Sequence, residues 1–251
     1  MKMRLNLKYS LGFSLVEMAV VLIILGFVLG ALLMPVQVQR QQQAQLQTES
    51  LLEISKKSLI GYAQSQGRLP CPATRNGTAV FPDDQGVANP SAGGLCTQQT
   101  GFLPAATLGI QPTDSNGFAL DGWGNPLRYA VTQSIASGAA TPDFTTIGGM
   151  AAVGIATLKP DVRVCASSTA ASCTDDINVA KNVVTVIYSL GPTGNVAAGG
   201  ADEGENLDMD TIFISHESRS ASDANGEFDH ILTWISPFVL YNAMIEAGQL
   251  H

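Results

Sequence analysis

The chain is short of basic residues, and this shortage limits its partners. Lysine and arginine together number 13 against 21 aspartates and glutamates, which gives a net charge of −8 at pH 7. Three of the basic residues, Lys2, Arg4 and Lys8, lie within the first 12 positions, so the rest of the chain is more acidic still. A surface of this sign repels phosphate backbones and anionic lipid headgroups. The composition therefore argues against nucleic acid as a partner and favours cation binding or simple solubility.

Histidine is also scarce, and its three positions do not indicate catalysis. His216, His230 and His251 lie in neither a nucleophile elbow nor an H-E-x-x-H sequence. An enzyme needs a nucleophile, a base and a group that orients the base, and no such convergent set is visible. We therefore expect the chain not to be an enzyme.

Charge is missing altogether from the segment between Glu17 and Arg40. The apolar run from Met18 to Val36 has 19 residues, which is enough for a helix to cross a hydrocarbon core of ~30 Å. Basic residues precede the run, so the N-terminus is expected to stay in the cytoplasm and the chain after about residue 38 to be exported. A conventional cleaved signal peptide is shorter and has no use for a glutamate at the start of its apolar segment.

Glu17 is a single acid at the start of this apolar run. On insertion scales a charged side chain at the centre of a membrane helix costs about 2.5 to 3.5 kcal/mol, so such a residue needs a partner. If the chain were cut after Gly12, the new α-amino group of Phe13 would be the nearest candidate.

The segment GFSLVE, with a short basic leader before it and an apolar run after it, resembles the N-terminus of prepilins. These are the precursors of type IV pilins and type II secretion pseudopilins. The resemblance implies that prepilin peptidase cleaves between Gly12 and Phe13 and methylates the Phe13 amine. It also implies that Glu17 of an incoming subunit pairs with the Phe13 amine of its neighbour as subunits join a helical filament. The protein would reside in the bacterial inner membrane, with a periplasmic domain, before it enters a periplasmic pseudopilus or a surface pilus.

The same resemblance implies an α+β, pilin-like fold in which a long N-terminal helix packs on an antiparallel β-sheet domain. The helical pattern runs from Phe13 to about Gln66 and is expected to continue through Pro35. Its exported half contains an apolar stripe at helical spacing, formed by Leu51, Leu52, Ile54, Leu59 and Tyr62. Four parts are expected: the leader, residues 1–12; the membrane-spanning half of the helix, 13–38; the exported half, 39–67; and a periplasmic globular domain, 68–251.

Within the globular domain, β-branched and aromatic residues predict several strands. These are Leu127–Thr132, Arg163–Ala166, Val183–Leu190, Thr211–Ser215 and His230–Trp234. Residues 69–117 are dense in proline, glycine, asparagine and aspartate and are expected to have little regular structure. Ser236 followed by Pro237 predicts the N-cap and first residue of a short C-terminal helix.

All four cysteines, Cys71, Cys96, Cys165 and Cys173, follow the predicted membrane segment. An even number in an oxidising compartment predicts two disulfides. Three pairings are open, and we favour the sequence-local one, Cys71–Cys96 with Cys165–Cys173. Metal ligation is the alternative, but the chain has no C-x-x-C spacing to support it.

Two further segments resemble parts of the major pseudopilins. Asp121 to Tyr129, DGWGNPLRY, is similar to a DxWGNPxxY motif, for which we expect a structural turn leading into a strand. The segment from Tyr188 to Ile212 is similar to a loop that wraps a calcium ion. The resemblance implies Leu190 and Asp208 or Asp210 as ligands, since calcium takes carboxylate and carbonyl oxygens. Asp202 is a further candidate ligand in the same loop, because its carboxylate can compensate for a departure from the family pattern. Thr193 stands where the family has an aspartate, and a solvated acidic loop without an ion is the alternative.

These motifs favour a type II secretion pseudopilin, whereas the large exported domain with two disulfides suits a minor subunit of either filament system. The alternative function is that of a pilus-tip adhesin or ligand-binding minor pilin. Glu17 argues against the outermost tip position, because the occupant of that position has no subunit above it.

Overall fold

A computed structural model describes residues 14–74, 86–168, 173, 177–194 and 200–251, without the side chains of residue 29 and residues 31–36. The predicted leader, residues 1–12, and the predicted cleavage site between Gly12 and Phe13 lie outside the described residues. The chain divides into two compact units, Met1–Gln43 and Ala44–His251.

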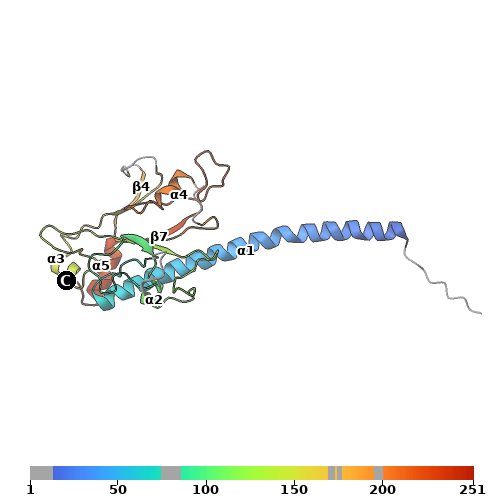
Figure 1. The fold of residues 1–251 in the computed structure, drawn as a ribbon. Helices are drawn as coiled ribbons and strands as arrows, with labels where there is room; N and C mark the ends of the chain where they lie inside the picture. The colour runs from blue at the N-terminus through green and yellow to red at the C-terminus, as the bar shows by residue number, and fades with distance from the viewer. Residues whose placement is uncertain (1–13, 75–85, 169–172, 174–176, 195–199) are drawn as a thin grey trace, which may run out of the picture. The chain divides into compact units, whose positions relative to one another are not determined.

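Helix α1, Leu15–Gln66, is continuous through Pro35, as predicted (Figure 1). In the first unit, the large apolar side chains described from Leu15 to Val28 are all exposed. Among the residues that the structure describes, no helix is long and apolar enough to cross a membrane.

In the second unit, the C-terminal part of α1 packs into the domain core. Leu51, Leu52, Leu59 and Ala63 are buried there. Ile54, which was predicted to belong to the same stripe, is instead 47% exposed. The prediction was wrong for Ile54 because Ser55 takes the inward position beside it and bonds the Leu51 carbonyl oxygen at 2.7 Å.

Two sheets form the body of this unit. The first has the order β1-β2-β5-β7 and is antiparallel throughout. Its strands are Thr100–Phe102 (β1), Arg128–Val131 (β2), Thr185–Ser189 (β5) and Ile231–Ile235 (β7). The second has the order β4-β3-β6, from strands Val162–Cys165 (β3), Asn178–Val183 (β4) and Ile212–Ile214 (β6). Here β3 pairs antiparallel with β4 but parallel with β6, so the expectation of purely antiparallel pairing was wrong for this sheet.

Side chains of the first sheet alternate between its two faces, and the two faces contribute to different cores. Tyr129 and Ile187 face a core that includes the C-terminal part of α1. Ala130, Val186 and Tyr188 face a second core shared with β3, β4 and β6. Each fully buried large apolar side chain contributes about 1.5 to 3 kcal/mol. Because one core lies on each face of the first sheet, the unit has three layers: the C-terminal part of α1, the four-stranded sheet and the three-stranded sheet.

The described residues of this unit also form four shorter helices: Ala105–Leu108 (α2), Gly149–Val153 (α3), Ala201–Glu205 (α4) and Pro237–Glu246 (α5). The predicted C-terminal helix is confirmed, including its cap, because Val239 N–H donates to Ser236 Oγ at 3.4 Å. Leu240, Tyr241 and Met244 of α5 lie in the same core as α1.

Both disulfides, Cys71–Cys96 and Cys165–Cys173, have the predicted sequence-local pairing. The first ties the segment after α1 to the loop before β1. The second closes the segment after β3 and packs with Ile214 and Phe228 in a small separate core.

Candidate functional site

The N-terminus of α1 is closed by a reciprocal pair of hydrogen bonds between Ser14 and Glu17. The Glu17 N–H donates to Ser14 Oγ at 3.2 Å, and the Ser14 N–H donates to Glu17 Oε2 at 3.5 Å. This is a capping box, in which each side chain satisfies a backbone donor that the helix leaves open. Glu17 therefore has a local role besides the one expected in assembly. The S-x-x-E spacing in the sequence was the signal for it.

Beyond this cap, the first unit presents apolar side chains around the whole helix. Leu15 is 91% exposed, Leu25 48% and Phe27 78%. These residues lie at different angles around the helix axis, so no single stripe is turned toward a core. An apolar surface of this kind marks a site for protein or membrane contact.

In the second unit, the DGWGNP segment forms the predicted structural turn, organised around Asp121. The Asp121 side chain is 4% exposed, and its Oδ1 accepts hydrogen bonds from the N–H groups of Trp123 and Asn125 at 2.9 and 2.8 Å. Its Oδ2 accepts one from Ser189 Oγ at 2.5 Å. Three donors thus stabilise one buried carboxylate.

The turn also connects the helix to the Ser189-Leu190-Gly191 segment. On the helix side, the Gly122 N–H donates to Thr48 Oγ1 at 2.9 Å, and that hydroxyl donates to the Ala44 carbonyl at 2.8 Å. On the other side, Asn125 Nδ2 donates to the Gly191 carbonyl at 2.7 Å. The two segments that resemble pseudopilin motifs are therefore in direct contact, and their hydrogen bonds connect α1 to the end of β5.

The structure brings together only part of the predicted calcium ligand set. Asp208 and Asp210 join Glu205 in a cluster whose carboxylate oxygens lie within 4.8 Å of one another. Burial raises the pKa of Glu205, and the neighbouring Asp208 and Asp210 charges raise it further. Leu190 is buried, and its carbonyl oxygen accepts a hydrogen bond from the Gly194 N–H at 3.1 Å.

Asp202, the remaining predicted ligand, already has protein partners. Its Oδ1 accepts from the Ser168 N–H at 2.7 Å, and its Oδ2 pairs with the guanidinium of Arg219 and with His216 Nε2. Burial acts against the charge of Asp202, but the bonds from Ser168, Arg219 and His216 outweigh it and lower its pKa. Any calcium site in this loop therefore rests on Asp208 and Asp210, with Glu205 in place of Asp202.

Calcium binding to this cluster is testable by thermal unfolding of the full-length chain with its disulfides intact. At 100 times its dissociation constant, calcium would stabilise the domain by about 2.7 kcal/mol and raise Tm by several degrees. Asp208→Ala and Asp210→Ala should each remove most of this response and leave the metal-free Tm nearly unchanged. Glu246→Gln, an exposed acid on α5, is the control and should keep the response. A Tm indifferent to both calcium and chelator would show that the loop is a solvated acidic surface.

A second acidic cluster, which the sequence did not reveal, joins Glu203, Asp229 and His230. Glu203 Oε1 accepts from the Asp229 N–H at 2.9 Å, and burial raises the pKa of Glu203 to about 7. Burial lowers the pKa of His230 to about 4. Glu203 belongs to α4, whereas Asp229 and His230 immediately precede β7. Glu203 and Asp229 are 26 positions apart, so no local spacing could have indicated the cluster.

The Nδ1 atom of the His230 ring is bonded to a side chain of the protein. The Ile214 N–H donates to Asn206 Oδ1 at 2.7 Å, which fixes the orientation of the Asn206 amide. Asn206 Nδ2 is then the donor to His230 Nδ1 at 3.1 Å. In the neutral ring the proton therefore lies on Nε2, which is buried and has no hydrogen-bond partner among the described residues.

Comparison with known proteins gives no relative. No protein-family model, no curated protein and no solved structure matches the chain.

Proposed function

We propose that the chain is a structural subunit of a type IV pilus-like filament, either a type II secretion pseudopilin or a minor pilin. The observation that supports the proposal most is the first unit of the structure. Its helix begins at a Ser14–Glu17 cap and continues with large apolar side chains that are exposed throughout the part described from Leu15 to Val28. This is what a subunit requires if its helix lies first in lipid and afterwards among identical helices.

The proposed mechanism is assembly rather than turnover. Residues 13–38 anchor the precursor in the inner membrane, and the exported domain lies in the periplasm. Prepilin peptidase removes residues 1–12 and methylates Phe13. Glu17 of an entering subunit then pairs with the Phe13 amine of its neighbour, which replaces two unpaired charges in lipid by one ion pair.

The two disulfides support an extracytoplasmic place for the second unit, because such bonds persist in oxidising compartments. The central position of the DGWGNP turn between α1 and β5 supports the pseudopilin form of the proposal, since the motif serves there as a joint of the long-helix-and-sheet plan.

Processing is the direct test. Mass spectrometry of membrane or filament material from the native host should give a mature chain that begins at N-methylated Phe13. Gly12→Lys should block the cut, because the peptidase must accommodate a residue without a side chain before the cleaved bond. An unmethylated chain that begins at Met1, or one cut beyond Val36, would contradict the proposal.

A further inference from the structure

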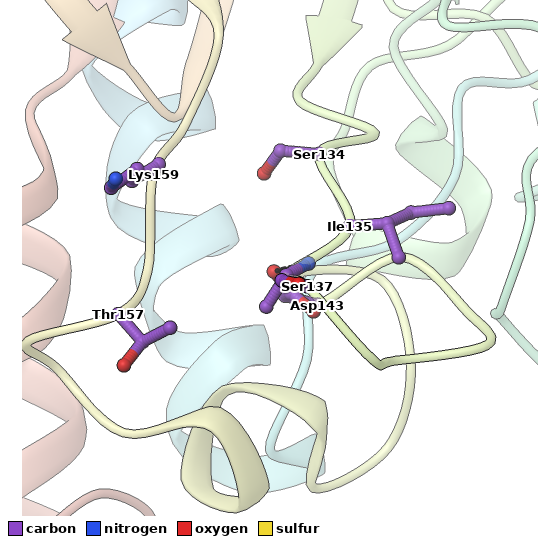
Figure 2. A pocket seen from close by; sticks show the side chains of 7 residues that line it. Ser134, Ile135, Ser137, Asp143, Thr157 and Lys159 are labelled. Atoms are coloured by element: carbon purple, nitrogen blue, oxygen red, sulfur yellow. Dashed lines mark hydrogen bonds between the residues drawn. The ribbon is translucent and has the colours of Figure 1, made fainter.

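A small hollow between two loops of the second unit is poorly suited to hold a charged ligand. Its volume is about 150 Å³, with Ser134 and Asp143 on one side and Thr157 and Lys159 on the other (Figure 2). The Lys159 side chain is directed away from the hollow, and Asp143 is only 2% exposed. The two charged side chains are therefore not presented together to a ligand.

The first sheet offers a more open surface at one of its edge strands, which are β1 and β7. The outer edge of β1 is covered, because Phe102 exchanges two backbone hydrogen bonds with Ala73, at 2.8 and 2.9 Å. Within the described part of the chain, β7 pairs with β5 alone, and no isolated bridge lies on its other side. The outer edge of β7 is therefore available to a further strand.

β7 also lacks the irregularities that protect natural sheet edges. All of its residues, Ile231–Ile235, pair in unbroken register with Thr185–Ser189 of β5. By contrast, the pairing of the edge strand β4 with β3 contains register shifts, and Asn182 of β4 has a φ of 54°. The edge strand β6 has only 3 residues. Because bulges and short length hinder the addition of a strand, β7 is the edge to which a strand adds most readily.

The composition of β7 gives it no protection either. Its sequence, ILTWI, contains neither a charged residue nor a proline. Charged side chains, lysine above all, and proline commonly keep an edge strand unpaired, and β4 carries Lys181. The first four residues of β7 are partly exposed, whereas every residue of its neighbour β5 is buried. A regular, uncharged and exposed edge of this kind is a site for pairing with another chain.

A second copy of the chain does not fit this edge. Antiparallel pairing of two β7 strands, the more stable form, places a two-fold axis perpendicular to the sheet. Such an axis reverses the direction of the α1 segment that packs on this sheet. Two subunits anchored in one membrane, as the proposed function requires and on which this exclusion rests, cannot point in opposite directions.

The two ends of β7 differ in character, and this difference restricts the partner further. Acidic residues gather where the strand begins, since burial, and beyond it the charges of Asp229 and Glu227, raise the pKa of Glu203 to about 7. Beyond the other end, Phe238 is 80% exposed. A strand added antiparallel to β7 has its C-terminal end beside the acidic residues. Charge complementarity therefore favours a basic residue at that end and uncharged residues before it.

We propose that an extended segment of another protein adds to β7 as an antiparallel strand. The segment carries uncharged β-branched or aromatic residues along the strand and a lysine or arginine at its C-terminal end. In such an addition the backbone hydrogen bonds supply affinity, and the side chains supply specificity. The contact does not use Glu17 or the apolar part of α1, so it gives the exported domain a binding role beyond filament assembly.

The probe for this edge is the peptide acetyl-VTVTVKK-amide, N-methylated at alternate residues so that only one of its edges can pair. The full-length chain in detergent should bind it with a Kd on the order of 0.1 mM, because the free peptide loses chain entropy on binding. Amide hydrogen exchange at saturating peptide should slow at least threefold in β7 and stay unchanged in β4. The peptide methylated at every residue keeps its side chains but should not bind. Replacement of both lysines by glutamate should weaken binding several-fold.

A pair of variants tests the edge from the side of the chain. Thr233→Lys places a charge in the middle of β7 and should weaken binding of the probe at least tenfold. Val179→Lys is the matched control, since Val179 lies on β4 and is 47% exposed. It should leave binding unchanged. The melting temperature of each variant shows whether the fold is kept.

The absence of saturable binding of the probe, or equal binding of the fully methylated peptide, would overturn the proposal. So would equal slowing of exchange in β4 and β7, which decides the matter even if Thr233→Lys does not fold. A dimer of the unaltered chain that Thr233→Lys dissociates would show that a second copy occupies the edge, and this too would overturn it. None of these results bears on cleavage after Gly12, so a failure here is distinct from a failure of the proposed function.

Discussion

Gly122→Ala should destabilise the second unit by about 3 kcal/mol, because the added methyl group has no space beside the helix. A Cβ at this position would lie 2.6 Å from the Ala44 carbonyl carbon and closer still to the carbonyl oxygen. Both atoms belong to the backbone of α1, so no side-chain rotation can relieve the overlap. The helix would have to move away from the turn, and the bond between the Gly122 N–H and Thr48 Oγ1 would be lost with it.

The measurement is thermal unfolding of the full-length chain with its disulfides intact. A loss of about 3 kcal/mol in a domain of this size corresponds to a fall in Tm of roughly 6 to 12 °C. Gly61→Ala is the matched control, since its Cβ would meet nothing within 4 Å. Alanine is favoured over glycine within a helix by about 0.5 to 1 kcal/mol, so this variant should melt at the same temperature or slightly higher. Equal melting of the two variants would show that the turn does not hold the helix.

Filament incorporation should fall at least tenfold in Glu17→Gln, although the helix cap is kept. Glutamine at the third helical position can still receive the Ser14 N–H, so the capping box survives. Glutamine is neutral, so the negative charge of Glu17 is removed and the Phe13 amine of the neighbouring subunit loses its ion-pair partner in lipid. An unpaired charge there costs about 2.5 to 3.5 kcal/mol, and about 1.4 kcal/mol is already a factor of ten in an equilibrium.

Ser14→Ala is the matched variant, because it removes the cap hydroxyl and keeps the charge. It should cost the helix about 1 kcal/mol and leave incorporation close to normal. Incorporation is measured as the share of the chain found in sheared filaments relative to the membrane fraction, with total expression held equal. Normal assembly of Glu17→Gln together with poor assembly of Ser14→Ala would mean that Glu17 acts by capping the helix, and the charge-pairing mechanism would have to be abandoned.

The capping role of Glu17 and its proposed role in assembly illustrate how far local patterns extend. The acid was singled out because it stands before a long apolar run, and that property is visible in the sequence. Its hydrogen bonds with Ser14 follow from a spacing of three residues, which is equally visible in the sequence.

The predicted calcium ligands show the opposite case. Asp202 and Asp208 are close in the chain, yet Asp202 turns to Arg219 and His216 while Asp208 joins Glu205 and Asp210. Arg219 lies 17 positions beyond Asp202, and no spacing rule connects them. Competition between protein partners and a cation for the same carboxylate is decided by which groups the fold brings within bonding distance.

The sequence by itself determined the elements whose signals are local. These are the helix from Leu15 to Gln66, the Ser236–Pro237 start of α5, the turn at Asp121 and the cores of most strands. Each depends on contacts within a few residues, through side-chain periodicity, caps or turn hydrogen bonds. The pairing of the cysteines was open to three arrangements, and the structure shows the one with the shortest loops.

Tertiary structure alone decided the rest. The strand Thr100–Phe102 forms in a segment rich in turn residues because β2 offers it a pairing edge. The split into two sheets, with β6 parallel to β3, depends on which faces can be buried together, since both faces of the first sheet are apolar. The burial of Asp143, whose carboxylate has a single hydrogen-bond donor among the described residues, results from loops that the fold closes over it. Such features arise from long-range packing, whose free energy depends on residues that lie far apart in the sequence.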